Sequence, residues 1–215
     1  METSLMKKNN TRRGKKTMLV GITGGIGVGK SFCAEIFKWL GVPLYIADKE
    51  AKLIMIQDQD VKAAIIDLFG KESYIDDGRI NRKHLAKVIF SDPSQLAKMN
   101  AIVHPAVRDH FRKWADMHQN HPYIIQESAL IFETGSFKLF DKVIVVDAPL
   151  ELRISRTMTR DHTSREEVLA RISKQYDQKE KVELADHIIH NDGRQMIIPQ
   201  IIQIHHVLLD ELSIT

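Results

Sequence analysis

Residues 24–31 have the spacing and the residue types of a loop that binds phosphate groups. They read Gly-Gly-Ile-Gly-Val-Gly-Lys-Ser, which fits the pattern G-x-x-x-x-G-K-[ST]. Glycines let backbone N–H groups turn toward phosphate oxygens, and the N-terminus of a following helix adds partial positive charge. Lys30 would reach the β- and γ-phosphates of a nucleotide, and the Ser31 hydroxyl would hold Mg²⁺. We therefore expect contacts to the nucleotide from Gly25, Ile26, Gly27, Val28, Gly29, Lys30, Ser31 and Phe32.

A second candidate is Asp48, which stands just after the short apolar run of residues 42–46. In an open parallel sheet, the carboxyl ends of the strands line the ligand crevice. A carboxylate there can accept the proton of an attacking hydroxyl and orient this group toward the γ-phosphorus. The same position also suits the N-cap of a helix that starts at Lys49, so position alone leaves both roles open.

Apolar runs and helical stripes alternate along the chain and predict an α/β fold with a parallel sheet. Runs without polar alternation are typical of strands that are covered on both faces. A helix over residues 32–40, stopped by Gly41, stands between the first two runs. With the phosphate loop between the first run and this helix, the pattern indicates the phosphate-loop NTPase fold, a parallel sheet flanked by helices. The predicted strands cover residues 18–23, 42–46, 123–125, 143–146 and 187–189.

Two long stretches between the predicted strands are helical in pattern. The first, over about residues 49–120, is too long for a simple crossover, and we expect a helical insertion that recognises a substrate. The second covers about residues 151–182. It includes a charged helix that begins at the capping-box sequence Ser164-Arg165-Glu166-Glu167 and is expected to reach about Glu180. An amphipathic helix over residues 197–212 closes the chain.

The length of 215 residues, with 43% hydrophobic and 27% charged residues, predicts one folded domain over residues 18–215. The formal net charge of +3 is concentrated at the start, because residues 1–17 carry +5 and the remainder −2. We expect this basic head to be disordered, and a nucleic-acid arm is the alternative. No apolar run predicts a signal peptide or a membrane span. The single cysteine, Cys33, excludes an internal disulfide and is consistent with a reducing cytosol.

Six segments, in the order of the chain, resemble the successive signatures of the dephospho-CoA kinase family. The phosphate loop is common to many families, but the aspartate, Asn-Ala-x-x-His-Pro and Arg-Thr-Met-x-Arg-Asp segments are together specific. The similarity extends over essentially all of residues 18–212. It implies ATP-dependent phosphorylation of the ribose 3′-hydroxyl of dephospho-CoA, the last step of coenzyme A synthesis. The segments are residues 24–31, 47–52, 100–105, 130–133, 156–161 and 185–193.

The resemblance implies that Asp48 is the base for the 3′-hydroxyl and that Lys30 holds the γ-phosphate. Family members usually carry a second acid two residues before this aspartate and an arginine four residues after it, whereas this chain has Ile46 and Lys52. Lys52 keeps the positive charge for a phosphate but loses the bidentate geometry. Glu127 matches an acidic position of the family that would bind Mg²⁺ through water or orient the acceptor sugar. We favour Glu127 over Glu133, with a structural role as the alternative.

The resemblance also implies acceptor-binding groups on the helical insertion. Arg79 and Arg82 match a turn that opens a helix, where they would meet the diphosphate of the acceptor; a solvated basic face is the alternative. His104 and Arg108 lie one helical turn apart and would face the same side. His104 would otherwise satisfy backbone groups in the core.

In the second helical stretch, Arg156 and Arg160 also lie one helical turn apart. The resemblance makes residues 151–182 the lid, whose arginines close over ATP and offset charge on the transferred group, with a solvated basic face as the alternative. Asn191 matches a turn beside the adenine. We expect ATP and Mg²⁺ as cofactors, a small-molecule acceptor, no nucleic-acid or membrane partner, and a cytoplasmic monomer.

Two other functions remain open at this level: another small-molecule kinase of the same architecture, and a nucleotide-gated switch. The long insertion with its Asn-Ala-x-x-His-Pro segment argues against the first. Residues 67–70 fit the D-x-x-G pattern of GTPases, but they close a predicted helix instead of following a strand. No Asn-Lys-x-Asp segment is present to recognise guanine, which argues against the second.

Overall fold

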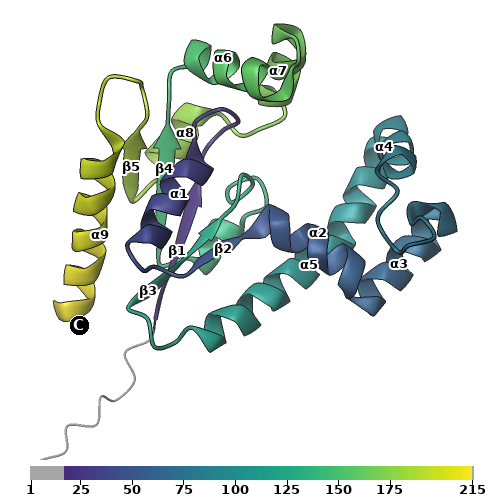
Figure 1. The fold of residues 1–215 in the computed structure, drawn as a ribbon, viewed down its shortest axis with the longest axis horizontal. Helices are drawn as coiled ribbons and strands as arrows, with labels where there is room; N and C mark the ends of the chain where they lie inside the picture. Colours follow the sequence, from purple (N-terminus) through teal and green to yellow (C-terminus); the bar gives the residue numbers. More distant parts are fainter. Residues whose placement is uncertain (1–16, 215) are drawn as a thin grey trace, which may run out of the picture.

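A computed structural model describes residues 17–214, and its centre is a five-stranded parallel sheet (Figure 1). The strand order is β2-β3-β1-β4-β5, and every neighbouring pair is parallel. The predicted α/β class, a parallel sheet flanked by helices, is therefore confirmed. The disorder predicted for the basic head falls almost wholly outside the described residues. The strands are β1 (Met18–Thr23), β2 (Leu44–Ile46), β3 (Tyr123–Glu127), β4 (Lys142–Asp147) and β5 (His187–His190).

Helices cover both faces of the sheet, which explains why the strands lack polar alternation. On one face, α1 (Lys30–Trp39) and α9 (Ile197–Ile214) pack against a cluster that includes Ile22 and Ile144, both fully buried. On the opposite face, Phe111 of α5 (Pro93–Met117) packs with Tyr45 and Ile124 of the sheet. Burial of these apolar groups fixes the position of α1, and with it the phosphate loop that precedes this helix.

The helical insertion projects from one edge of the sheet as an arm (Figure 1). It is built on an apolar cluster of its own, in which Ile65, Phe69, Leu85 and Val103 are buried. Acid and amide side chains cap its helices: Asp58, Asn81 and Asp92 accept hydrogen bonds from the first turns of α3, α4 and α5. The arm consists of α2 (Ala47–Gln57), α3 (Gln59–Phe69), the 3₁₀ turn η1 (Lys71–Ser73), α4 (Arg82–Ser91) and the first half of α5.

The second helical stretch contains α6 (Leu150–Asp161), α7 (Arg165–Ile172) and α8 (Gln178–Glu183). The predicted N-cap is confirmed, because Ser164 Oγ accepts the backbone N–H of Glu167. The predicted continuation of this helix to about Glu180 is wrong, since residues 173–177 are not helical. Asp177 instead caps a new helix by accepting the N–H of Lys179 at 2.7 Å. Breaking the helix here lets the connection reach the phosphate loop.

Two other predicted boundaries shift by two residues. The helix predicted over residues 32–40 begins at Lys30, directly after Gly29, whose φ of +89° ends the loop. The strand predicted over residues 42–46 begins at Leu44; the preceding Pro43 accepts the N–H of Ile125 but has no N–H of its own to donate. Within the described residues, no helix is both long and apolar enough to cross a membrane.

Candidate active site

The phosphate loop joins β1 to α1 and lies tightly against α6 and the turn after β5. Gly27 and Gly29 have φ values of +79° and +89°, which side-chain-bearing residues rarely adopt. A side chain at Gly27 would collide with the backbone carbonyl of Arg153, and one at Gly29 with the Asn191 amide. Glycine is thus required at both positions by the backbone conformation and by the close approach of neighbours.

Backbone amides of this loop and of the first turn of α1 have no hydrogen-bond partner among residues 17–214. They stand at the N-terminus of α1, which also has no side-chain cap. Free N–H groups and the positive end of the helix dipole make such a terminus an anion-binding site. The amides belong to Gly27, Gly29, Lys30, Ser31 and Phe32, all of which were predicted to contact the nucleotide.

The side chains of Lys30 and Ser31, at the start of α1, both contact the carboxylate of Glu127 at the end of β3. The Lys30 Nζ lies 2.9 Å from Glu127 Oε1, and the Ser31 hydroxyl donates to the same oxygen at 3.3 Å. The Glu127 residue is 3% exposed, so its charge depends on these partners. In the sheet register Glu127 stands opposite Ile22 of β1 and Ile46 of β2. The ends of three strands therefore meet at this cluster.

Asp48 lies two residues beyond Ile46, in the first turn of α2. The N-cap of this helix is Ile46, so the capping role that the sequence left open for Asp48 is wrong. The Asp48 side chain is exposed and makes no hydrogen bond or ion pair with any residue that the structure describes. A carboxylate free of partners, at the carboxyl edge of the sheet, is available to accept a proton.

Arg156 and Asn191 lie together beside the phosphate loop. The two terminal nitrogens of Arg156 donate to the backbone O and the Oδ1 of Asn191, at 3.2 and 3.1 Å. The Asn191 Nδ2 in turn donates to the carbonyl of Val28 at 2.7 Å. Arg160, by contrast, is largely exposed and paired with Asp161 at 2.7 Å. In this structure, Arg156 is thus linked to the loop, while Arg160 is held at the surface by its own neighbour.

Three side chains that the sequence analysis did not identify hold the front of the phosphate loop, Gly25 and Ile26. Gln178 Oε1 accepts the N–H of Gly25 at 3.0 Å, and Gln175 Oε1 accepts that of Ile26 at 2.9 Å. Arg153 Nε donates to the Ile26 carbonyl at 3.0 Å. Only Arg153 has a local signal in the sequence, since it precedes Arg156 by three residues and shares its helix face. No spacing rule identifies the two glutamines.

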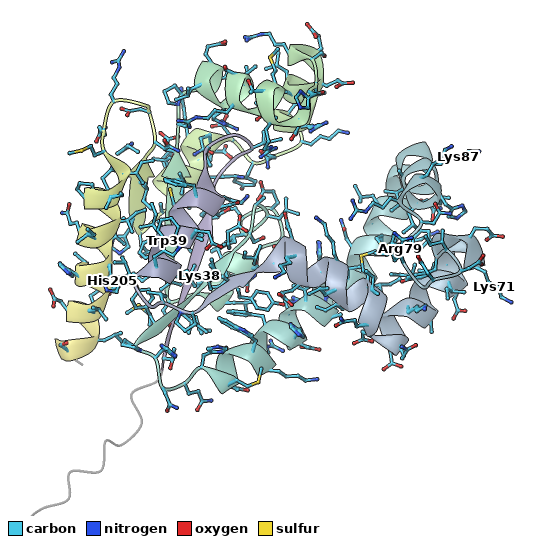
Figure 2. All side chains as sticks on the ribbon, viewed as in Figure 1. Lys38, Trp39, Lys71, Arg79, Lys87 and His205 are labelled. Carbon is cyan, nitrogen blue, oxygen red and sulfur yellow. The ribbon has the colours of Figure 1, made fainter. Side chains whose placement is uncertain are left out.

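The predicted acceptor-binding residues lie on the arm, and no described contact links them to the phosphate loop. Arg79, labelled on the arm in Figure 2, pairs with Asp77. Lys52 and Arg82 are exposed and have no described side-chain partner. His104 is half-buried, and burial and the neighbouring charge of Arg108 lower its pKa. The lowered pKa keeps the His104 imidazole neutral at pH 7, so this side chain does not supply a cation there.

Free loop amides and a loop lysine at the carboxyl edge of a parallel sheet are characteristic of phosphate-loop NTPases, and the chain is a member of this class. Its sequence matches the dephospho-CoA kinase family over residues 18–196, and the chain belongs to this family. It is 38% identical over 185 residues to the dephospho-CoA kinase of Bacteroides fragilis (strain YCH46), covering 86% of this chain and 90% of that protein. The resemblance stated from the sequence is confirmed.

Solved structures agree with this assignment. A crystal structure of TT1252 from Thermus thermophilus has a TM-score of 0.80 at 32% identity, and the match covers 91% of this chain and 99% of that one. The dephospho-CoA kinase from Campylobacter jejuni has a TM-score of 0.68 at 27% identity, with 90% and 98% of the two chains covered. About nine tenths of the chain is thus similar in structure to these two proteins.

Proposed function

We propose that this enzyme transfers the γ-phosphoryl group of ATP to the ribose 3′-hydroxyl of dephospho-CoA, giving coenzyme A. The family and the names of the relatives support this reaction. One structural observation carries the assignment of the site: free loop amides, Lys30 and Glu127 converge at the carboxyl edge of the sheet where Asp48 stands.

In this proposal the loop binds the phosphates and neutralises part of their negative charge. The free amides at the start of α1 donate to phosphate oxygens, and the ammonium of Lys30 contacts the β- and γ-phosphates. Lys30 is paired with Glu127 at 2.9 Å in the described structure, so its side chain is already directed toward the strand ends. Catalysis of phosphoryl transfer depends mainly on such positioning and on charge neutralisation.

Asp48 is assigned as the base of the reaction. Its carboxylate has no described partner that would hold it away from a substrate. It would accept the proton of the 3′-hydroxyl as this oxygen bonds to the γ-phosphorus and the bond to the bridging oxygen of ADP breaks. Arg156 and Arg160, in the predicted lid, are assigned the role of neutralising the negative charge that spreads over the transferred phosphoryl group.

The donor atoms near Lys30 fit a magnesium ion. Mg²⁺ prefers hard oxygen ligands and is usually held by one or two protein groups together with phosphates and water. The Ser31 hydroxyl and the Glu127 carboxylate supply two such oxygens, 3.3 Å apart. Among residues 17–214, no group of three or more His, Cys, Asp or Glu side chains could hold a metal ion. When bound, the ion would neutralise part of the phosphate charge.

We assign the acceptor to the arm, where Lys52, Arg79, Arg82, His104 and Arg108 are the candidate contacts. We also propose that the enzyme is a cytoplasmic monomer; the single cysteine, Cys33, is buried and suits a reducing compartment. Size-exclusion chromatography with light scattering tests the oligomeric state, and a mass near twice 24.6 kDa would contradict it.

The reaction is tested by incubating the purified protein with ATP, Mg²⁺ and dephospho-CoA and following coenzyme A by mass spectrometry. A parallel panel offers shikimate, adenosine and AMP as acceptors. Formation of coenzyme A with no transfer to the panel is the expected result. Transfer to another alcohol but not to dephospho-CoA would contradict the proposed acceptor, while ATP binding without any transfer would favour a nucleotide-gated switch.

A further inference from the structure

The peptide group of Ile26 is held from both sides by the second helical stretch. Arg153, near the start of α6, donates to its carbonyl, and Gln175, between α7 and α8, accepts from its N–H. Arg153 is 5% exposed, and burial lowers the pKa of its guanidinium, while the nearby Asp147 and Asp177 oppose this shift. The front of the phosphate loop is therefore shaped by side chains more than 120 positions away in the sequence.

The two glutamines at the loop differ in how firmly they are anchored. Gln178 uses both ends of its amide, since its Nε2 donates to Val146 O at 3.1 Å and to Asp147 Oδ1 at 3.0 Å while its Oε1 accepts from Gly25. Among residues 17–214, the Gln175 side chain makes a single hydrogen bond, the one to Ile26. Gln178 is therefore a fixed brace, whereas the Gln175 side chain can leave at the loss of one hydrogen bond.

The backbone next to Gln175 is fixed independently of the loop. The N–H of Tyr176 donates to Glu133 Oε1 at 3.0 Å, and the buried ammonium of Lys181 lies 2.6 Å from the same oxygen. These contacts hold the connection between α7 and α8 against the segment that follows β3. Release of the Ile26 N–H therefore requires only rotation of the Gln175 side chain, and the connection between α7 and α8 need not move.

The side-chain carbonyl oxygen of Gln175 is a neutral hydrogen-bond acceptor, and an anionic phosphate oxygen is a stronger one for the same N–H. The free amides at the N-terminus of α1 suit the inner phosphates of a bound nucleotide, which leaves the front of the loop for the outermost one. We propose that Gln175 is a positioning residue that occupies the Ile26 amide in the nucleotide-free enzyme and yields it to the γ-phosphate of ATP. ADP has no γ-phosphate and leaves the contact intact. This inference rests on the proposed nucleotide site.

The contact has a measurable consequence for affinity. Because ATP must displace Gln175 and ADP need not, the contact weakens the binding of ATP alone. In Gln175→Ala, the affinity for a non-hydrolysable ATP analogue is expected to rise about two- to tenfold, the range of one net hydrogen bond, while ADP affinity is unchanged. Isothermal titration calorimetry with Mg²⁺ measures both constants.

Two further variants separate this role from a purely structural one. Gln178→Ala removes the fixed brace and is expected to weaken the analogue and ADP equally. Gln119→Ala changes an exposed glutamine whose side chain donates to Asp116, far from the loop in sequence, and should alter neither affinity. Gln175→Glu keeps an acceptor at Ile26 but adds a negative charge beside the γ-phosphate, so it should weaken the analogue at least fivefold more than ADP.

The proposal is overturned if Gln175→Ala changes both affinities by the same factor, or changes neither. A Gln175→Glu variant that weakens the analogue and ADP equally would also contradict it, and this test remains if the alanine variant fails to fold. Failure of the proposed function is seen separately, as a wild-type protein that binds neither nucleotide or forms no coenzyme A.

Discussion

Lys181 offers a test of how the second helical stretch is held to the sheet. Its side chain has no exposed area, and its Nζ lies 2.6 Å from Glu133 Oε1, whose side chain is 16% exposed. Glu133 Oε2 is buried without a hydrogen bond in the described structure, so Lys181 and the Tyr176 N–H are the groups that offset the buried charge. Lys181→Ala would leave this carboxylate without its cation and create a cavity.

The expected cost follows from the burial of the pair. Removing one partner of a buried ion pair typically costs about 3–5 kcal/mol of folding free energy. For a protein of roughly 200 residues, each kcal/mol lowers Tm by about 2–4 °C, so the fall should be roughly 6–20 °C. Differential scanning calorimetry and urea denaturation of the nucleotide-free protein measure the two quantities.

A double variant tests the cause of that loss. Lys181→Met with Glu133→Gln removes both charges, keeps much of the buried volume, and retains an acceptor for the Tyr176 N–H. It should recover at least half of the lost stability, since replacing both charges of a buried pair is often near neutral. Lys179→Ala, an exposed lysine of α8, is the control. A fall below 3 °C for Lys181→Ala, or a double variant no more stable than the single one, would refute this reasoning.

Three other expectations concern the site and the core. Asp48→Asn should lower kcat by about 10²–10⁴-fold and leave ATP affinity nearly unchanged. The control Asp60→Asn, in the first turn of α3, should leave kcat unchanged. A kcat of Asp48→Asn within threefold of wild type in steady-state kinetics would exclude the role of Asp48 as base. Lys30→Met should reduce both ATP affinity and kcat. The control Lys38→Met, in the last turn of the same helix, should change neither quantity. Equal ATP affinity of the two variants in calorimetry would contradict the assignment of Lys30. Burial raises the pKa of the Cys33 thiol to about 12, so the thiol stays protonated through neutral pH. Its labelling by iodoacetamide at pH 8 should therefore be slow until urea unfolds the protein. Rapid labelling of the folded protein would show that the thiol is accessible.

Much of the fold was predictable because its signals are local. The strands are apolar runs with no polar alternation, and Ser164, Asp92 and Gly41 mark the ends of helices by conformational preferences of single residues. The role of Asp48 was less accessible, since the choice between an N-cap and a free carboxylate depended on whether α2 begins at Ala47 or at Lys49. Sequence patterns locate such boundaries only to within a few residues.

The sequence by itself determined the phosphate loop, the α/β class and the family, because each depends on residue types at short, fixed spacings. Only the tertiary structure decided which groups hold that loop. Gln175 and Ile26 are 149 positions apart, and Arg156 and Asn191 are 35 apart. Contacts of this kind leave no periodicity in the chain, since they form only when the sheet brings separate segments together. The break between α7 and α8 has the same cause, because the contacts of residues 175–178 outweigh the local preference for a continuous helix.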